Sequence, residues 1–234
     1  MNPNDPNVIL LEFVAGRLGE QLRQTMVFVG GAVAGLLVTD PAMPAIRATE
    51  DVDLIVQVAA LTDYHRLEQS LRDSGFTQDP SPDAPICRWR VGPALVDVMP
   101  TLESILGFSN RWYPLALESA VSTTLPSGLH IKLISAPVFI ATKLEAFAGR
   151  GEGDYLFSHD LGDVIAVIDG RDSLIAECHG TDLALRRYLR ERFAQLLANR
   201  RFREALPGYL LTDPGSQARL PDLLQKLQAL GALR

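Results

Sequence analysis

The segment RATEDVDLIV, residues 47–56, contains two carboxylates, Asp51 and Asp53, that alternate with apolar residues. Side chains two residues apart on a strand point to the same face, so these carboxylates lie side by side while Val52 and Leu54 point into a core. Two like charges this close disfavour joint ionisation, and a divalent cation that prefers oxygen ligands compensates them. The pattern therefore predicts a Mg²⁺ or Mn²⁺ site.

A third acid, Asp97, stands alone in the apolar run LVDVM, residues 95–99. If that strand lies beside residues 51–58, Asp97 joins the face of Asp51 and Asp53, and three carboxylates can hold one or two Mg²⁺ ions. Two such ions about 3.5–4 Å apart clamp the attacking and leaving oxygens of a phosphoryl displacement. In the alternative, Asp51 and Asp53 only begin a strand at its solvated edge, and Asp97 pairs with an arginine such as Arg90.

The apolar run MVFVGG, residues 26–31, ends in Gly30 and Gly31, and we expect a helix over residues 32–38. Backbone N–H groups at the start of a helix bind phosphate, and glycine lets the backbone approach it closely. A phosphate cradle beside a metal cluster is what transfer from a nucleoside triphosphate (NTP) requires. The stretch GGAVAG is not the dinucleotide-binding fingerprint, because Ala32 stands where that motif has a glycine.

The Gly-Gly turn followed by Asp-x-Asp on the next strand resembles the nucleotidyltransferase superfamily of polymerase-beta-like fold. The form RATEDVDL more specifically resembles the AbiEii-like and MenT-like toxins of type IV toxin–antitoxin systems. That branch has a Lys-Leu motif and then an Asp-x-x-Asp motif on two later helices. Here ATKLEAFAGRG supplies Lys143, and HDLGDV supplies Asp160 and Asp163. The resemblance covers roughly residues 26–170.

The resemblance implies a Mg²⁺-dependent enzyme that moves a nucleoside monophosphate (NMP) from an NTP to a hydroxyl acceptor. It implies that Asp51 and Asp53 bind the metal and that the Gly30 and Gly31 amides hold the β- and γ-phosphates. Asp97 would ligate the catalytic metal and help to deprotonate the acceptor.

It further implies that Lys143 contacts the triphosphate and that Asp160 orients Lys143 or the acceptor. In the alternative, Lys143 is an exposed helix lysine and Asp160 caps a helix near Ser158. Arg47 and Thr49 either contact phosphate or brace the loop before the strand.

The acceptor stays open between RNA, a small hydroxylated molecule such as a sugar or antibiotic, and a protein hydroxyl. Residues 182–204 contain seven arginines against three acids, a net charge of +4, which leaves −10 for the rest of a chain whose total is −6. These arginines either grip RNA phosphates, as at a tRNA 3′ end, or form a solvated helix face with i,i+4 ion pairs. A toxin would also have a cognate antitoxin. A different class altogether is a catalytically silent module that binds a nucleotide or a partner.

The elements that must position these residues indicate an α+β fold. We expect a nucleotidyltransferase-type mixed sheet with flanking helices over residues 1–134. It has helices over residues 8–23 and 61–75, the latter capped by Thr62, and hairpins around Gly92-Pro93 and in VSTTLPSGLHIKLIS. A helical part over residues 135–234 contributes Lys143 and Asp160. In this part, Ser158 can cap the helix expected over HDLGDVIAVIDG.

The 234 residues are 47% hydrophobic, and no apolar run is long enough to span a membrane. The start of the chain lacks the basic region of a signal peptide, and Cys87 and Cys178 form no CxxC pair. We therefore expect a soluble cytoplasmic protein with reduced cysteines.

Overall fold

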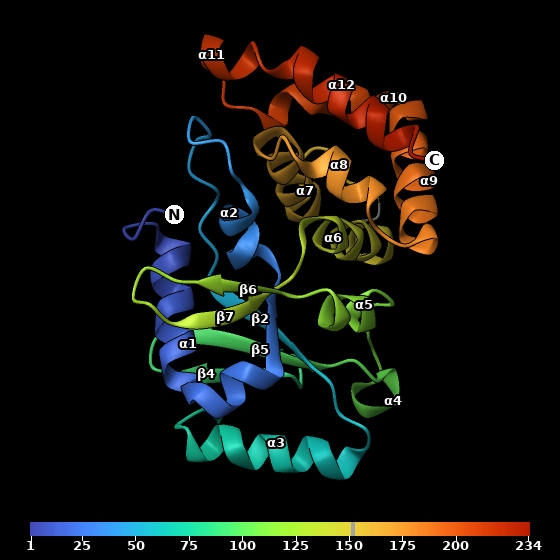
Figure 1. Cartoon of the computed structure of the whole chain (residues 1–234). Coiled ribbons are helices and arrows are strands. Elements are labelled where there is room, and N and C mark those ends of the chain that lie inside the picture. The colour runs from blue at the N-terminus through green and yellow to red at the C-terminus, as the bar shows by residue number, and fades with distance from the viewer. Residues whose placement is uncertain (151–152) are drawn as a thin grey trace. The chain divides into compact units, whose positions relative to one another are not determined.

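The computed structural model describes residues 1–150 and 153–234, and it divides the chain into two compact units. Unit 1 contains residues 1–36 and 47–135, and unit 2 contains residues 37–46 and 136–234. The sequence had placed residues 37–46 with the first part of the chain. The expected α+β architecture is confirmed, with a mixed sheet flanked by helices and a helical C-terminal part (Figure 1).

Unit 1 is built on a seven-stranded sheet in the order β3-β4-β5-β2-β1-β7-β6. The strands are β1 (Met26–Val29), β2 (Asp51–Val56), β3 (Thr77–Gln78), β4 (Arg88–Val91), β5 (Ala94–Pro100), β6 (Val121–Thr124) and β7 (His130–Leu133). The pairs β2–β5 and β1–β7 are parallel, and the other neighbours are antiparallel. Both expected hairpins, β4–β5 and β6–β7, are present.

The helices of unit 1 are α1 (Pro6–Thr25), the 3₁₀ turn η1 (Gly31–Val33), the short α2 (Ala34–Leu37) that leads into unit 2, α3 (Leu61–Asp73), α4 (Glu103–Leu106) and α5 (Tyr113–Glu118). Helix α1 packs against β1, β2, β5 and β7, and its N-terminus is capped by the Asp5 carboxylate. The expected Thr62 cap is wrong, because α3 begins after Ala60, which makes no side-chain cap. The helix expected over residues 32–38 is only the 3₁₀ turn η1 followed by one turn of α2.

One face of the central strands is a fully apolar core. Phe28, Leu54 and Val98 stand side by side on β1, β2 and β5, and Val52, Val96 and Trp89 form the next row on β2, β5 and β4. All six side chains are fully buried. Because side chains alternate along a strand, this core fixes which residues of the same strands must point to the opposite face.

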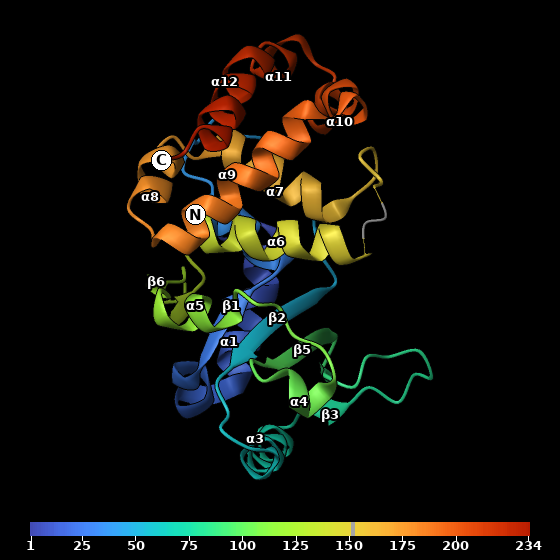
Figure 2. The same cartoon turned by 90° about the vertical axis from the view of Figure 1, so that its right-hand side faces the viewer.

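Unit 2 is helical (Figure 2). Its helices are α6 (Ala136–Arg150), α7 (His159–Gly170), α8 (Leu174–His179), α9 (Leu183–Ala198), α10 (Arg200–Ala205), the 3₁₀ helix η2 (Leu206–Tyr209), α11 (Pro214–Gln217) and α12 (Leu220–Gly231). Helix α6 packs on α7, and α12 packs on α9. Both α9 and α12 carry fully buried leucines, such as Leu189 and Leu227. Ser158 caps α7, as expected, by accepting the Leu161 backbone N–H.

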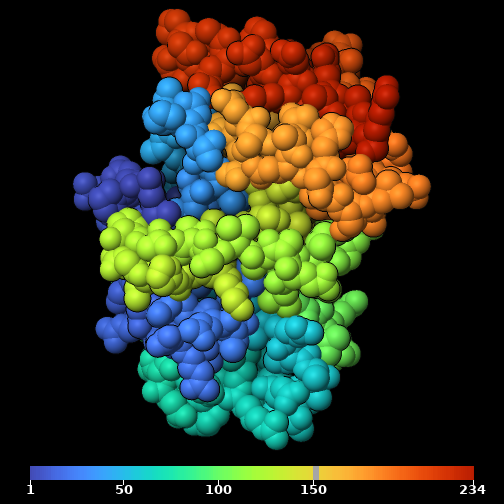
Figure 3. Space-filling view, in the orientation of Figure 1, coloured from blue at the N-terminus to red at the C-terminus, as the bar shows by residue number. Residues whose placement is uncertain are grey.

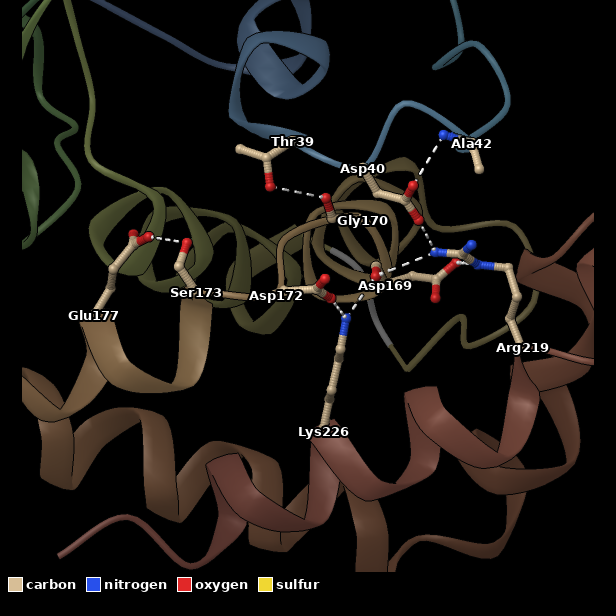
Figure 4. Close-up of polar contacts among 10 residues, drawn as sticks. All are labelled: Thr39, Asp40, Ala42, Asp169, Gly170, Asp172, Ser173, Glu177, Arg219 and Lys226. Atoms are coloured by element: carbon tan, nitrogen blue, oxygen red, sulfur yellow. Dashed lines mark hydrogen bonds and ion pairs between the residues drawn. The ribbon is translucent and has the colours of Figure 1, made fainter.

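Residues 37–46 form a strap that lies against the helices of unit 2 (Figure 3). Polar contacts attach it there. The backbone N–H groups of Thr39 and Asp40 donate to the Gly170 carbonyl at 2.8 and 2.9 Å. Arg219 of unit 2 donates to Asp40 and to Asp169, both at 2.8 Å (Figure 4). Such contacts between distant parts of the chain are not visible as a local sequence pattern.

In the described part of the chain, no helix combines the length and apolarity needed to cross a membrane. Cys87 and Cys178 are both buried and both free thiols.

Candidate active site

The three candidate metal ligands lie on one face of the sheet of unit 1. Asp53 on β2 is the direct partner of Asp97 on the parallel strand β5, and Asp51 is the partner of Leu95. Asp51 lies two residues before Asp53 and therefore points to the same side. The opposite side of these strands is the apolar core. The expectation that Asp97 joins the face of Asp51 and Asp53 is thus met by the strand register.

Arg88 on β4 occupies this carboxylate face together with the three acids. Its Nε donates to Oδ1 of Asp97 at 2.8 Å, and its Nη2 donates to Oδ2 of Asp97 at 2.7 Å. The same Nη2 also donates to Oδ2 of Asp51 at 3.1 Å. Arg88 therefore holds Asp97 with a two-pronged contact and bridges it to Asp51.

The alternative in which Asp97 pairs with an arginine is confirmed, but the partner is Arg88 and not Arg90. The strands β4 and β5 are joined by the two-residue turn Gly92-Pro93, which sets Arg88 opposite Asp97 and Arg90 opposite Leu95. Arg90 instead pairs with Asp79, with its Nε at 2.9 Å from Oδ1. The register of a two-residue hairpin follows from the turn, so the sequence contained the signal for Arg88.

Electrostatics reinforce both arginine pairs. Hydrogen bonding to Asp97 raises the pKa of the Arg88 guanidinium, with smaller effects from the charges of Asp97 and Asp51, so Arg88 stays a cation. Hydrogen bonds from Arg90, and then from Ser81, lower the pKa of Asp79 to about 2.

Gly30 makes room for the carboxylate of Asp53. Gly30 adopts φ 73° and ψ −169°, a backbone conformation that is essentially restricted to glycine. A Cβ atom built on Gly30 would lie 1.7 Å from Oδ2 of Asp53, which is deep inside van der Waals contact. The side chain of Asp53 therefore lies against the backbone at the end of β1. Gly31, the other candidate phosphate ligand, is buried at the start of η1.

The segment that leads into β2 is braced by a buried asparagine of α1. The Asn7 amide donates to the Arg47 carbonyl at 3.0 Å, and its oxygen accepts the Thr49 backbone N–H at 2.9 Å. The Thr49 hydroxyl donates to the Asp51 carbonyl at 3.2 Å. Thr49 thus braces the approach to Asp51, while the side chain of Arg47 is exposed. Sequence reasoning missed Asn7, which has no local signature.

Unit 1 also contains a cavity of about 660 Å³ that sequence reasoning did not anticipate. Thr49 and Glu50, directly before Asp51, form part of its polar lining together with Arg90. The rest of the lining is apolar: Pro6, Ile9, Leu10, Phe13, Pro93 and Leu95. Its size is that of a small-molecule site, and it adjoins the start of β2.

The carboxylate face suits a divalent cation in its donor chemistry. Three carboxylates share one face, and a guanidinium already bridges two of them, so the surface is built for positive charge. In the side-chain arrangement of the described residues, however, no group of three or more His, Cys, Asp or Glu is placed to hold a metal ion. The ligands are of the right kind, but Asp51 and Asp97 are oriented toward Arg88.

The candidate residues of unit 2 form a nearly buried ion-pair cluster. Nζ of Lys143 on α6 lies 3.2 Å from Oδ1 of Asp160 and 2.7 Å from Oδ2 of Asp163 on α7. The side chains of Lys143, Asp160 and Asp163 are 11%, 9% and 4% exposed. The alternatives of an exposed lysine and a capping Asp160 are therefore wrong, since Ser158 is the cap. Sequence reasoning named Asp163 but did not place it in the site, although it is the closer partner.

The arginines of residues 182–204 are used in several ways. Arg200 forms the expected i,i+4 type of ion pair with Glu204 at 2.7 Å, and Arg186 donates to the Arg234 carbonyl at 2.9 Å. Three further arginines are exposed: Arg187 lies on α9, and Arg201 and Arg203 lie on α10.

No protein-family model matches this chain, and a search of curated proteins finds no match for it either.

Proposed function

We propose that this chain is a nucleotidyltransferase that moves an NMP from an NTP to a hydroxyl acceptor. The observation that supports it best is the register of β2 and β5, which makes Asp53 and Asp97 direct neighbours with Asp51 on the same face. This face begins beside the turn at Gly30, where the end of β1 approaches Asp53. Three carboxylates next to a glycine turn form the donor set that phosphoryl transfer uses.

A bound Mg²⁺ or Mn²⁺ would neutralise charge on the triphosphate, held by Asp51, Asp53 and Asp97. The protein's own part is positioning, because phosphoryl transfer leaves little covalent chemistry to the side chains. Gly30 allows Asp53 to stand against the backbone, and Asn7 and Thr49 fix the start of β2. Asp97, the most buried of the three acids, is the candidate base that takes the proton from the hydroxyl group of the acceptor.

Lys143 is the candidate contact to the triphosphate. Asp160 and Asp163 hold its ammonium group between α6 and α7, so its position is set before any ligand binds. A cation held in this way within unit 2 is preorganised to stabilise phosphate charge. Arg47, whose side chain is exposed, is a further candidate for phosphate contact.

RNA is the acceptor that we favour, because Arg187, Arg201 and Arg203 are exposed cations on adjacent helices of unit 2. With RNA as acceptor, the chain would act in the cytoplasm, as a toxin with a cognate antitoxin. A small hydroxylated molecule is the alternative acceptor, and the 660 Å³ cavity beside Asp51 favours it.

The test is incubation of the protein with each α-labelled NTP and Mg²⁺, together with either total cellular RNA or a pool of small metabolites. Label in RNA supports the favoured acceptor, and label in the small-molecule fraction supports the alternative. RNA binding should weaken as salt rises, since each phosphate contact releases counterions. Absence of label in every fraction would contradict the proposal.

A second candidate function is a catalytically silent module that binds a nucleotide or a partner protein. The contact of Arg88 with Asp51 and Asp97 favours it, because a guanidinium that stayed there would keep a metal from both carboxylates. In that case the protein binds an NTP without turning it over, which the same labelled NTPs measure by equilibrium dialysis.

A further inference from the structure

We propose that Arg88 is a positioning residue, a built-in counter-cation that competes with a divalent cation for Asp51 and Asp97. This inference rests on the proposed function, in which these carboxylates bind a metal. Beyond that function, we infer two alternative arrangements of the carboxylate face. In one, Arg88 binds Asp51 and Asp97; in the other, the metal binds them.

The position of Arg88 is fixed by the backbone. The two-residue turn at Gly92-Pro93 sets Arg88 opposite Asp97, and the Asp79 backbone N–H donates to the Arg88 carbonyl at 3.0 Å. Arg88 therefore cannot leave the carboxylate face by sliding along the sheet. Only its side chain can move, by rotating about its own bonds.

The side chain of Arg88 occupies the carboxylate oxygens of Asp97 and Asp51 that a metal would need as ligands. Both oxygens of Asp97 accept hydrogen bonds from Arg88, and one oxygen of Asp51 accepts a third. A metal bound to Asp97 would compete for the same lone pairs and would also repel the guanidinium. Metal and Arg88 therefore exclude one another at Asp97.

Exposure indicates from which side the exchange occurs. The side chain of Asp97 is 10% exposed, that of Arg88 is 22% exposed, and that of Asp51 is 36% exposed. The Asp51 contact is thus the open end of the bridge, and it is also the longer one. A cation from solvent reaches Asp51 first, and loss of that contact leaves Arg88 held by Asp97 alone.

The two arrangements differ little in formal charge. Asp51, Asp53, Asp97 and Arg88 sum to −2, and the same three aspartates with a divalent cation in place of Arg88 sum to −1. Without either cation the three aspartates sum to −3, so the removal of Arg88 strengthens their attraction for a metal. Arg88 also protects the fold, since a buried Asp97 without a partner is costly.

The experiment compares Arg88→Gln with the matched variant Arg90→Gln, which removes the neighbouring arginine of β4 that pairs with Asp79. Mn²⁺ binding to the full chain is measured by calorimetry, and thermal unfolding is followed with and without Mg²⁺. Arg88→Gln is expected to bind Mn²⁺ at least about tenfold more tightly than wild type. It should unfold at lower temperature without metal and recover with Mg²⁺, because a ligand of the native state stabilises it. Arg90→Gln should bind Mn²⁺ as wild type does.

A second measurement uses the wild-type chain, so the test does not depend on the folding of a variant. The Nε–H proton of Arg88 gives an NMR signal that reports its hydrogen bond to Asp97. Mg²⁺ should shift this signal and leave that of Arg90 unchanged. The proposal is overturned if Mn²⁺ affinity is the same in both variants or absent from both, or if Mg²⁺ leaves the Arg88 signal in place. Tight Mn²⁺ binding by Arg88→Gln, together with no NMP transfer by the wild-type chain, would refute the proposed function and leave the role of Arg88 intact.

Discussion

Asp53 on β2 and Asp97 on β5 are direct partners in a parallel strand pair, and both point away from the apolar core of unit 1. Two carboxylates in this relationship repel each other and add nothing to the packing of the sheet. Arg88 offsets part of this cost by holding Asp97. In the proposed function, this pair is kept because it binds a metal cation.

Gly30→Ala should disrupt the carboxylate face without touching a charge. The new Cβ would collide with Asp53, and the positive φ of Gly30 adds backbone strain of roughly 1–3 kcal/mol. Urea unfolding should show a loss of stability of at least that size. The control is Gly128→Ala, because Gly128 also has a positive φ, of 86°, but a Cβ there meets no atom within 4 Å. An equal loss in the two variants would show that strain, and not the contact with Asp53, is responsible.

Lys143→Met should destabilise the chain strongly, because it leaves Asp160 and Asp163 nearly buried without their shared cation. Removal of one partner from a buried ion pair costs about 3–5 kcal/mol. The control is Arg200→Met in the same unit, since Arg200 and its partner Glu204 are 84% and 60% exposed and such pairs contribute little. Chemical denaturation of both variants measures the difference. A smaller loss for Lys143→Met than for Arg200→Met would contradict the buried cluster.

The pair of Arg90 and Asp79 should stabilise the fold in a defined pH range. The pKa of Asp79 falls from its ordinary 3.8 to about 2 in the folded chain. The pair therefore stabilises the fold above about pH 4, and this contribution is lost as the pH falls toward 2. The stability advantage of wild type over Asp79→Asn, measured by urea unfolding, should be present at about pH 5 and shrink toward about pH 2. A pH-independent difference would show that Asp79 does not act through its charge.

Cys87 and Cys178 should resist thiol reagents in the folded chain. Burial raises the pKa of each thiol to about 12, and the nearby Asp97 carboxylate adds to the effect at Cys87. Because the thiolate is the reactive form, neither thiol should be alkylated at about pH 8 until the chain unfolds. Mass spectrometry after iodoacetamide treatment, with and without denaturant, tests this. Rapid labelling of the native chain would contradict the burial of these residues.

The sequence predicted the architecture well where periodicity and turn chemistry determine it. The two hairpins, the strand of Asp51 and Asp53, and the Ser158 cap of α7 follow from local patterns. The partner of Asp97 could also have been predicted, because a two-residue turn at Gly92-Pro93 sets the strand register that places Arg88 opposite Asp97.

Other features depend on contacts between distant residues. Asn7 braces Thr49 across 42 positions of sequence, and Arg219 reaches Asp40 across 179. No local sequence pattern around these residues predicts which distant residue they contact. The length of the helix after Gly31 was also overestimated. That helix ends at Leu37, because residues 37–46 pack with the helices of unit 2.

The most direct test of the proposed transferase compares wild type, Asp53→Asn and Asp83→Asn in Mg²⁺-dependent transfer of label from an α-labelled NTP to the acceptor fraction. Asp83 is the matched control, because it is an exposed aspartate of unit 1 that lies in neither the carboxylate face nor the lining of the cavity. We expect wild type and Asp83→Asn to transfer label equally. Asp53→Asn should lose at least about 100-fold, the scale seen when one charge-stabilising group is removed. Full activity in Asp53→Asn, or no transfer by wild type to any acceptor, would contradict the account.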